Sequence, residues 1–473
     1  MSIRMEELPV AVIGAGPVGL AAAAHLAERG IRFTVLEAGA GPAAAVRQWG
    51  HVRLFSPWRF NVDQAARRLL AEAGWVEPDP DVLPTGGQLA GDYLQPLADL
   101  PAVKPHVRYD ARVDAVTRLG LDRLRTVGRD TAPFLIRLAD GEDVLARAVI
   151  DASGTWGAPN VLGAAGIPAH GEAAASAFVE HALPDVLGAD RDRFAGRRTL
   201  VVGAGHSAAN TLLSLAELAG EVPGTGVVWA IRSASPARTY GGETADALPA
   251  RGALGTRLRE HVDAGTIRLV TGFSVQSVIV ADGRVVVSDG SDSIAVDRIV
   301  SATGFRPDHG IASELRLDLD AVMGSTRALA PLIDPNEHSC GTVPPHGVDE
   351  LTHPEPGYYA IGVKSYGRAP TFLLATGYEQ ARSVVAALAG DWDAARDVQL
   401  DLPETGVCNS NPVLDAGTVD ANSGGCCGAP AAETAPAARG LATGISGGLL
   451  SAPLALLPVG AEKAGEQGGG CCG

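Results

Sequence analysis

Apolar and polar residues change their spacing several times along the first 40 residues, and each change predicts an element. The continuous apolar run Val10–Ile13 is typical of a parallel strand buried on both faces. A glycine-rich turn follows, and small apolar residues at 20–26 predict a helix that packs closely on a sheet and ends near Gly30. The run 32–37 predicts a second strand. Residues 10–37 therefore form a predicted strand–helix–strand unit.

The turn of this unit has the spacing of a dinucleotide-binding fingerprint. Gly14, Gly16 and Gly19 allow the backbone to turn sharply and to approach a pyrophosphate without a Cβ in the way. Pro17 suits the first turn of the helix, whose free N–H groups and dipole face the phosphates. Glu37 lies roughly 20 residues further on, the usual position for accepting hydrogen bonds from a ribose. The whole pattern is in register, which favours a nucleotide site over a simple turn.

A second unit of the same design begins at residue 199. Apolar residues at 199–202 predict a strand, residues 211–219 a helix and residues 227–231 a second strand. The turn repeats the fingerprint with alanine in the third position, which is an accepted variant. The nucleotide contacts expected there are Gly203, Gly205, His206, Ser207 and Ala208.

The second strand of this unit ends in Arg232-Ser233 rather than in an acid. A guanidinium can hold a 2′-phosphate bidentately, whereas a carboxylate would repel it. The pair therefore indicates NADPH rather than NADH. The alternative is that Arg232 is a solvated charge at a strand end.

Two more predicted strands, 148–150 and 298–301, each end in small residues and a glycine. Such endings let the backbone pass close to a ligand or to another chain segment. Gly304, and Gly362 in the last predicted strand at 358–363, are expected to contact a cofactor. The loop 49–61 is rich in aromatic residues for a chain in which they make up 5%. Its Trp58 is expected to line a flavin or substrate cavity, with ordinary packing as the alternative.

Composition limits the class of protein. The 473 residues allow two or three domains, and the 46% apolar and 19% charged content is typical of a globular chain. A net charge of −16 argues against a nucleic-acid partner. The most apolar stretch, 441–460, is broken by glycines and prolines, so we expect no membrane span. The lack of a leader and of paired cysteines in the body predicts a cytoplasmic protein.

The two fingerprints, with the second placed between the two strands that end in glycine, resemble the flavin-dependent monooxygenases with two dinucleotide-binding domains. The resemblance, which covers residues 8 to about 390, implies an α/β fold of two Rossmann-like three-layer domains, with the NADPH domain inserted into the FAD domain. From Gly390 onward small residues dominate and periodicity fades, which predicts a flexible, low-complexity C-terminal tail. The expected boundaries are 1–160 and 297–390 for the FAD domain, 161–296 for the NADPH domain and 391–473 for the tail.

The resemblance also implies a reaction. In that family NADPH reduces FAD, O₂ adds to give a flavin C4a-hydroperoxide, and one oxygen passes to a small soft nucleophile. Catalytic positions are expected at Asn61, over the flavin, and at His170, near the nicotinamide. The family motif around that histidine lacks its two aromatic residues here, which puts stabilisation of the hydroperoxide in question. Segments such as residues 53–58 and 364–372 are similar to segments of flavin monooxygenases from actinobacterial arsenic-resistance operons. This similarity implies a trivalent arsenical as substrate.

Five of the six cysteines lie in the predicted tail: Cys408, Cys426, Cys427, Cys471 and Cys472. Adjacent cysteines are too close for ordinary disulfide geometry, so both pairs should stay reduced in the cytosol. Reduced vicinal thiols suit capture of a thiophilic ion such as trivalent arsenic, Zn²⁺ or Cu(I). The alternatives are lipid attachment, a redox relay to the flavin and a low-complexity extension without a function.

Two rival functions remain open. One is a pyridine nucleotide–disulfide reductase, similar to thioredoxin reductase, that uses the tail as a shuttle, although the body lacks a CxxC pair. The other is a metalloid-binding flavoprotein without turnover. The expected partners are a small-molecule substrate and O₂, and the chain is expected to be a monomer or a homodimer.

Overall fold

The computed structural model describes residues 4–241, 249–338 and 343–400. The described residues all belong to one compact unit of the chain. The five cysteines expected to bind a thiophilic ion, from Cys408 to Cys472, lie outside the described residues. No helix within the described residues is both long and apolar enough to cross a bilayer.

The first sheet contains five parallel strands in the order β16-β7-β1-β2-β3. Their bounds are β1 Val10–Ile13, β2 Phe33–Leu36, β3 Val107–Arg108, β7 Ala148–Asp151 and β16 Tyr358–Ala360. The main helices on one face are α1 Pro17–Glu28, α3 Gln64–Glu72 and α12 Leu374–Leu388. An antiparallel sheet of β4 Val113–Arg118, β5 Phe134–Leu138 and β6 Asp143–Ala146 covers the other face.

Strand β1 shows why this arrangement has three layers. Val10 and Val12 pack among the helices, whereas Ala11 and Ile13 pack against the antiparallel sheet. Because successive side chains of a strand point to opposite faces, a strand that is apolar throughout needs a cover on both sides. The uninterrupted apolar run in the sequence therefore matches a central strand.

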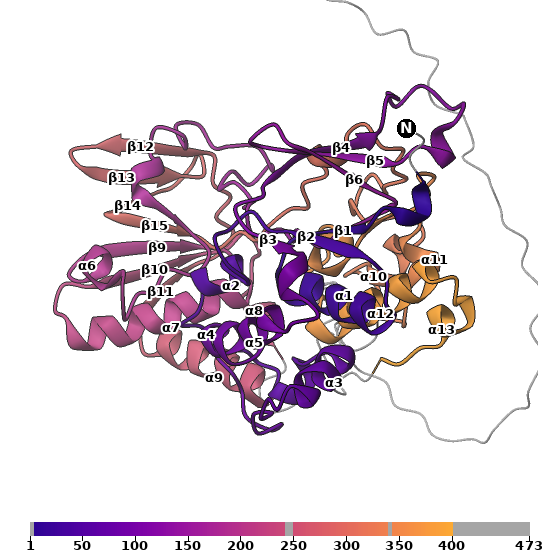
Figure 1. Cartoon of the computed structure of the whole chain (residues 1–473). Coiled ribbons are helices and arrows are strands. Elements are labelled where there is room, and N and C mark those ends of the chain that lie inside the picture. Colours follow the sequence, from indigo (N-terminus) through magenta and orange to yellow (C-terminus); the bar gives the residue numbers. More distant parts are fainter. Residues whose placement is uncertain (1–3, 242–248, 339–342, 401–473) are drawn as a thin grey trace, which may run out of the picture. The chain divides into compact units, whose positions relative to one another are not determined.

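The second sheet repeats the design with strands in the order β11-β10-β9-β15-β8, all parallel. Their bounds are β8 Val179–His181, β9 Arg198–Val202, β10 Gly226–Ala230, β11 Ile267–Val270 and β15 Arg298–Ser301. Helices α7 His206–Glu221 and α9 Pro249–Asp263 cover one face. The antiparallel strands β12 Ser277–Ala281, β13 Arg284–Ser288 and β14 Ser293–Val296 cover the other (Figure 1).

Short helices fill the connections. They are η1 Met5–Glu7, α2 Ala44–Gln48, η2 Trp58–Phe60, α4 Gly86–Gln88, η3 Leu89–Leu94, α5 Gln95–Asp99, η4 Lys104–His106, η5 Arg129–Thr131, η6 Ser176–Phe178, α6 Arg191–Phe194, α8 Ala237–Tyr240, η8 Gly310–Ala312, α10 Ala330–Ile333, α11 Val348–Leu351, η9 Gly362–Tyr366 and α13 Trp392–Arg396. The predicted α/β fold with one Rossmann-like portion inserted into another is confirmed.

The two segments that connect the sheets run side by side. Pro159 and Phe305 form an antiparallel bridge, and the Asn160 N–H donates to the Gly304 carbonyl over 2.9 Å. The ring of Trp156 stacks on that of Phe305 with centroids 5.0 Å apart. The chain thus enters and leaves the inserted portion through one paired crossover.

Two of the expected boundaries differ from the observed elements. Strand β15 pairs with β9 on one side and β8 on the other, so residues 298–301 lie in the second sheet although the FAD domain was expected to resume at 297. The expected tail, 391–473, begins with helix α13, which packs against α12 with Ala395 buried. In both places pairing or packing with other elements, and not composition, decides the boundary.

Candidate functional site

The first glycine-rich turn has the geometry of a phosphate cradle. Gly14 has φ +98°, and a Cβ there would lie 2.8 Å from the Ala152 carbonyl oxygen. A Cβ on Gly19 would lie 2.0 Å from the Gly14 carbonyl oxygen. By contrast, a Cβ on Gly16 would meet nothing among the described residues within 4 Å. Gly14 and Gly19 therefore let the turn close, while Gly16 leaves open space in front of α1, where a pyrophosphate fits.

Glu37, directly after β2, holds this turn together from the side. The carboxylate is only 9% exposed and accepts hydrogen bonds from Ala15 N at 2.6 Å and Gly39 N at 2.8 Å. Each carboxylate oxygen has more than one acceptor position, so both can also accept from ribose hydroxyls. Pro17 is the first residue of α1, as predicted.

The second turn repeats these relations. Gly203 has φ +138°, and a Cβ there would lie 2.1 Å from the Ala302 carbonyl oxygen. At Gly205 a Cβ would have open space in the described part of the chain. Ala208 is fully buried, so the helix has room for a methyl group at the third position. Helix α7 begins at His206, and the half-buried Ser207 follows in its first turn.

Arg232 lies exposed just beyond β10, beside the second turn. One of its guanidinium nitrogens donates to the Ala164 carbonyl at 3.1 Å, and with respect to the described residues most of its N–H groups remain for a phosphate. Ser233 donates through Oγ to the Ser235 carbonyl at 2.8 Å. Thr239 donates through Oγ1 to the Ala204 carbonyl at 3.0 Å and so ties this loop to the glycine-rich turn.

Gly304 and Gly362 both have positive φ, +89° and +73°. A Cβ on Gly304 would lie 3.3 Å from Asn160 Nδ2, in the paired crossover. A Cβ on Gly362 would lie 3.3 Å from the Val18 side chain at the start of α1, and the Gly362 N–H donates to Gln380 Oε1 at 2.7 Å. Gly362 therefore lies beside the first cradle, whereas Gly304 accommodates a neighbouring chain segment.

A buried ion pair at the carboxyl edge of the first sheet was not predicted. Lys364 Nζ lies 2.6 Å from Asp151 Oδ2 and donates to Ser153 Oγ at 3.1 Å. The Tyr358 hydroxyl also donates to Asp151, at 2.8 Å. Burial would raise the pKa of Asp151, but the Lys364 ammonium and these hydrogen bonds lower it below its ordinary value. The only sequence signal is an aspartate that ends a buried strand and a lysine two residues after a glycine.

Three predicted site residues make contacts other than those their expected roles require. Asn61 is fully buried, and its Nδ2 donates to the carbonyls of Ser56 at 2.7 Å and Pro57 at 3.0 Å. Both of its N–H groups therefore hold the loop, which does not favour a role over the flavin. Trp58 is 2% exposed and belongs to the hydrophobic core, which favours ordinary packing over lining a flavin or substrate cavity. His170 is exposed on a segment whose backbone pairs with residues 276–278.

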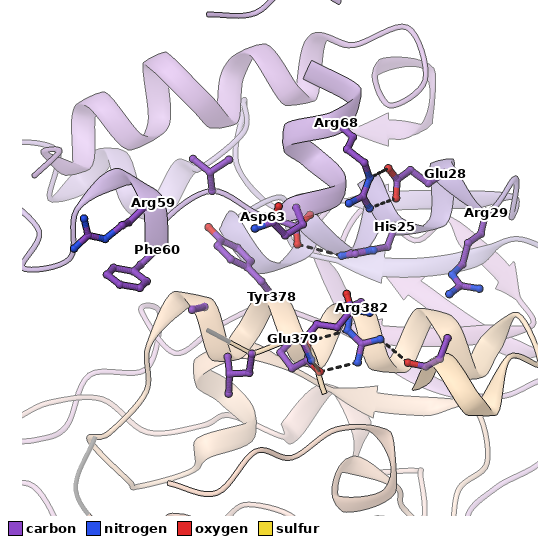
Figure 2. A pocket seen from close by; sticks show the side chains of 16 residues that line it. His25, Glu28, Arg29, Arg59, Phe60, Asp63, Arg68, Tyr378, Glu379 and Arg382 are labelled. Carbon is purple, nitrogen blue, oxygen red and sulfur yellow. Dashed lines mark hydrogen bonds and ion pairs between the residues drawn. The ribbon is translucent and has the colours of Figure 1, made fainter. Parts of the chain in front are cut away.

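A polar cavity of about 270 Å³ lies between α1, α3 and α12 (Figure 2). Its lining includes a hydrogen bond between His25 and Asp63 at 3.1 Å and two ion pairs, Glu28 with Arg68 at 2.7 Å and Glu379 with Arg382 at 2.6 Å. His25 is eight residues beyond Pro17, or about 12 Å along the helix axis. The cavity is therefore near the far end of α1 and is not the phosphate cradle.

Comparisons with known proteins identify the family and the fold. The profile of the pyridine nucleotide-disulphide oxidoreductase family matches residues 11–339. A ferredoxin–NADP reductase from Gluconobacter oxydans is 26% identical over 243 residues, which cover 49% of this chain and 63% of the relative. The chain thus spans less than two thirds of that relative's length.

Solved structures share the fold. Bacillithiol disulfide reductase Bdr (YpdA) from Bacillus cereus has a TM-score of 0.60 at 18% identity, with 81% of this chain and 99% of that chain covered. A mutant flavin monooxygenase from Stenotrophomonas maltophilia has a TM-score of 0.53 at 22% identity, with 81% and 98% covered. Disulfide reduction and oxygen transfer both occur on this fold, so the choice between them has to come from residues of this chain.

Proposed function

The chain belongs to the pyridine nucleotide-disulphide oxidoreductase family, and we propose that it is the monooxygenase type of flavoprotein within this fold. It is a flavin-dependent oxidoreductase whose cofactors are FAD and NADP(H). Under the proposal, NADPH and O₂ are consumed together, one oxygen atom goes to a soft nucleophile and the other becomes water. The two electrons come from NADPH, and a proton from solvent completes the balance.

The observation that supports oxygen transfer over dithiol chemistry is the distribution of cysteines. Cys340 is the only cysteine before residue 408, so the portion that contains both cradles has no pair of thiols to exchange with a disulfide. Reduction of a disulfide through a dithiol needs two sulfurs that form and break a bond with each other. FAD supplies the redox chemistry when bound, and the side chains around it need no thiol for oxygen transfer.

The residues of the two cradles have distinct tasks in this proposal. Gly16 and the start of α1 bind the FAD pyrophosphate, and Glu37 binds the adenosine ribose. Gly205 and the start of α7 bind the NADPH pyrophosphate, with Arg232 at its 2′-phosphate. The Asp151–Lys364 pair fixes the strand ends at the edge where ligands bind in open α/β sheets.

A trivalent arsenical is the proposed substrate class. Its lone pair makes arsenic a soft nucleophile that accepts an oxygen atom, and the vicinal cysteines in the sequence, Cys426-Cys427 and Cys471-Cys472, are suited to deliver it. The proposal requires the reducing cytoplasm, where such pairs stay reduced.

The test is a panel of arsenite, methylated trivalent arsenicals, sulfides and amines, scored by NADPH and O₂ consumption with peroxide leakage measured alongside. A true substrate raises both rates in a 1:1 ratio, suppresses peroxide and takes up ¹⁸O from ¹⁸O₂. Products without label would overturn oxygen transfer.

Disulfide reduction through the tail is the second candidate, favoured by the two vicinal cysteine pairs. A variant with all five tail cysteines changed to serine separates the two. Oxygen transfer by the bound flavin survives in this variant, although delivery of arsenicals weakens. NADPH-driven disulfide reduction that disappears in the same variant would favour the second candidate. Stoichiometric arsenite binding without NADPH turnover would instead favour a metalloid-binding flavoprotein.

A further inference from the structure

Phe55 lies where the FAD-binding portion meets the second cradle. Its half-buried ring contacts the ring of His206, with centroids 5.0 Å apart and an angle of 54° between the planes. His206 is the first residue of α7 and follows Gly205, whose Cβ direction is open among the described residues. An aromatic ring from one portion thus stands at the phosphate-binding turn of the other.

The loop that carries Phe55 is held firmly on both sides of it. Leu54 donates its N–H to the Pro84 carbonyl at 2.8 Å. On the other side, Asn61 spans the turn with two hydrogen bonds to the carbonyls of residues 56 and 57. Because these bonds fix the backbone before and after Phe55, the ring has a defined place and little loop entropy to lose when a ligand contacts it.

The position of Arg232 gives the direction of the nucleotide. Arg232 follows β10 and lies at the adenosine end of the cradle, while the Gly205 turn takes the pyrophosphate. The nicotinamide end has to point toward the flavin, because hydride passes between them. Phe55 comes from the FAD-binding portion, so it lies on the nicotinamide side of the pyrophosphate.

We propose that Phe55 binds the nicotinamide riboside half of NADP(H) by packing its ring against it, with His206 as the ring's partner when that half is absent. An aromatic face suits a flat nicotinamide ring, and offset or tilted stacking adds to the area that is buried. The proposal rests on FAD and NADP(H) as cofactors and not on oxygen transfer, so loss of the monooxygenase assignment leaves it intact.

Two ligands distinguish this role. NADP⁺ carries the nicotinamide riboside, whereas 2′,5′-ADP carries only the adenosine half with its 2′-phosphate. We expect Phe55→Ala in the oxidised FAD-loaded enzyme to weaken NADP⁺ binding roughly 3- to 10-fold, the range for one aromatic pair, and to change 2′,5′-ADP binding less than about twofold. Isothermal titration calorimetry measures both dissociation constants without turnover. Arg232→Ala should weaken both ligands alike.

Phe60→Ala is the matched control. Phe60 belongs to the same loop, but its ring lies under the Arg59 guanidinium at 5.0 Å and lines the cavity of Figure 2. This variant should bind both ligands as the wild type does. Phe55→Tyr should keep NADP⁺ binding, and Phe55→Leu, which preserves apolar volume if the alanine variant folds poorly, should weaken it. Equal losses for both ligands, unchanged NADP⁺ binding or tighter NADP⁺ binding in Phe55→Ala would overturn the proposal.

Discussion

Neutralising one member of the Asp151–Lys364 pair should destabilise the protein strongly, and the loss on removing the lysine should depend on pH. Both side chains are buried, with 0% of Asp151 and 1% of Lys364 exposed. Removing one partner of such a pair leaves an uncompensated buried charge and typically costs about 3–5 kcal/mol. The hydrogen bonds that remain to each partner narrow this range of lost unfolding free energy.

Lys364→Met leaves Asp151 with hydrogen bonds from Tyr358 and from Ser153, so part of its charge stays compensated. The carboxyl can also escape by taking up a proton, which from an ordinary pKa near 3.9 costs roughly 4 kcal/mol at pH 7 and about 1.5 kcal/mol at pH 5. We therefore expect a loss of about 3–4 kcal/mol at pH 7 that shrinks at pH 5.

Asp151→Asn leaves the Lys364 ammonium with Ser153 Oγ as a remaining acceptor at 3.1 Å. The loss should be about 4 kcal/mol at pH 7, within the range for an uncompensated buried charge. The double variant buries no charge and should lose less than either single change.

Guanidinium unfolding monitored by tryptophan fluorescence, with saturating FAD and at pH 5 and 7, measures these differences. The double-mutant cycle at pH 7 then gives the coupling energy of the pair. Single losses below about 1 kcal/mol, additive losses or a Lys364→Met loss independent of pH would refute an ionised buried pair.

Three further predictions address the cradles and the acid response. Gly16→Ala should fold with near-wild-type stability, because its Cβ meets open space among the described residues, but its FAD affinity should fall at least tenfold. Gly14→Ala should instead unfold more readily. Circular dichroism measures the stability of both variants, and fluorescence titration with FAD measures their affinity. Arg232→Ala should raise the KM for NADPH at least tenfold and leave that for NADH nearly unchanged in steady-state assays; equal effects would remove Arg232 from the 2′-phosphate site. Burial lowers the pKa of His353 to about 4, whereas an unfolded histidine titrates near 6.5. Between these two pH values the unfolded chain binds one more proton than the folded chain. The free energy of unfolding therefore falls as the pH drops from 6.5 to 4, by up to roughly 3 kcal/mol. His353→Gln should flatten that part of the urea-midpoint profile; an unchanged slope would mean that other groups cause it.

The geometry of the two glycine-rich turns was predictable because its signals are local. Gly14, Gly16 and Glu37 lie within one strand–helix–strand unit, and their residue types follow from backbone closure and phosphate approach. Gly203 and Arg232 repeat the relation in the inserted portion. Uninterrupted apolar runs likewise predicted the central strands, since both faces of each sheet are covered.

What was missed depends on contacts that the residue types alone do not reveal. Asp151 and Lys364 are 213 positions apart and meet only because β16 pairs with β7. Asn61 looked available for a flavin because hydrogen bonds to carbonyls of its own loop leave no trace in composition. The placement of β15 in the second sheet follows from pairing with β9, which the residue types of 298–301 do not specify.

The paired crossover has an engineering consequence. Pro159 and Phe305 are neighbours, so the start and the finish of the intervening 145 or so residues lie together, the arrangement in which domain insertion is tolerated. A short glycine–serine linker between these points should join the two parts of the portion that contains the first sheet, and the excised stretch should be exchangeable. Under the proposed cofactor assignment, replacing it with a nucleotide-binding domain of different coenzyme preference should change the electron donor while the first sheet and its glycine-rich turn stay intact.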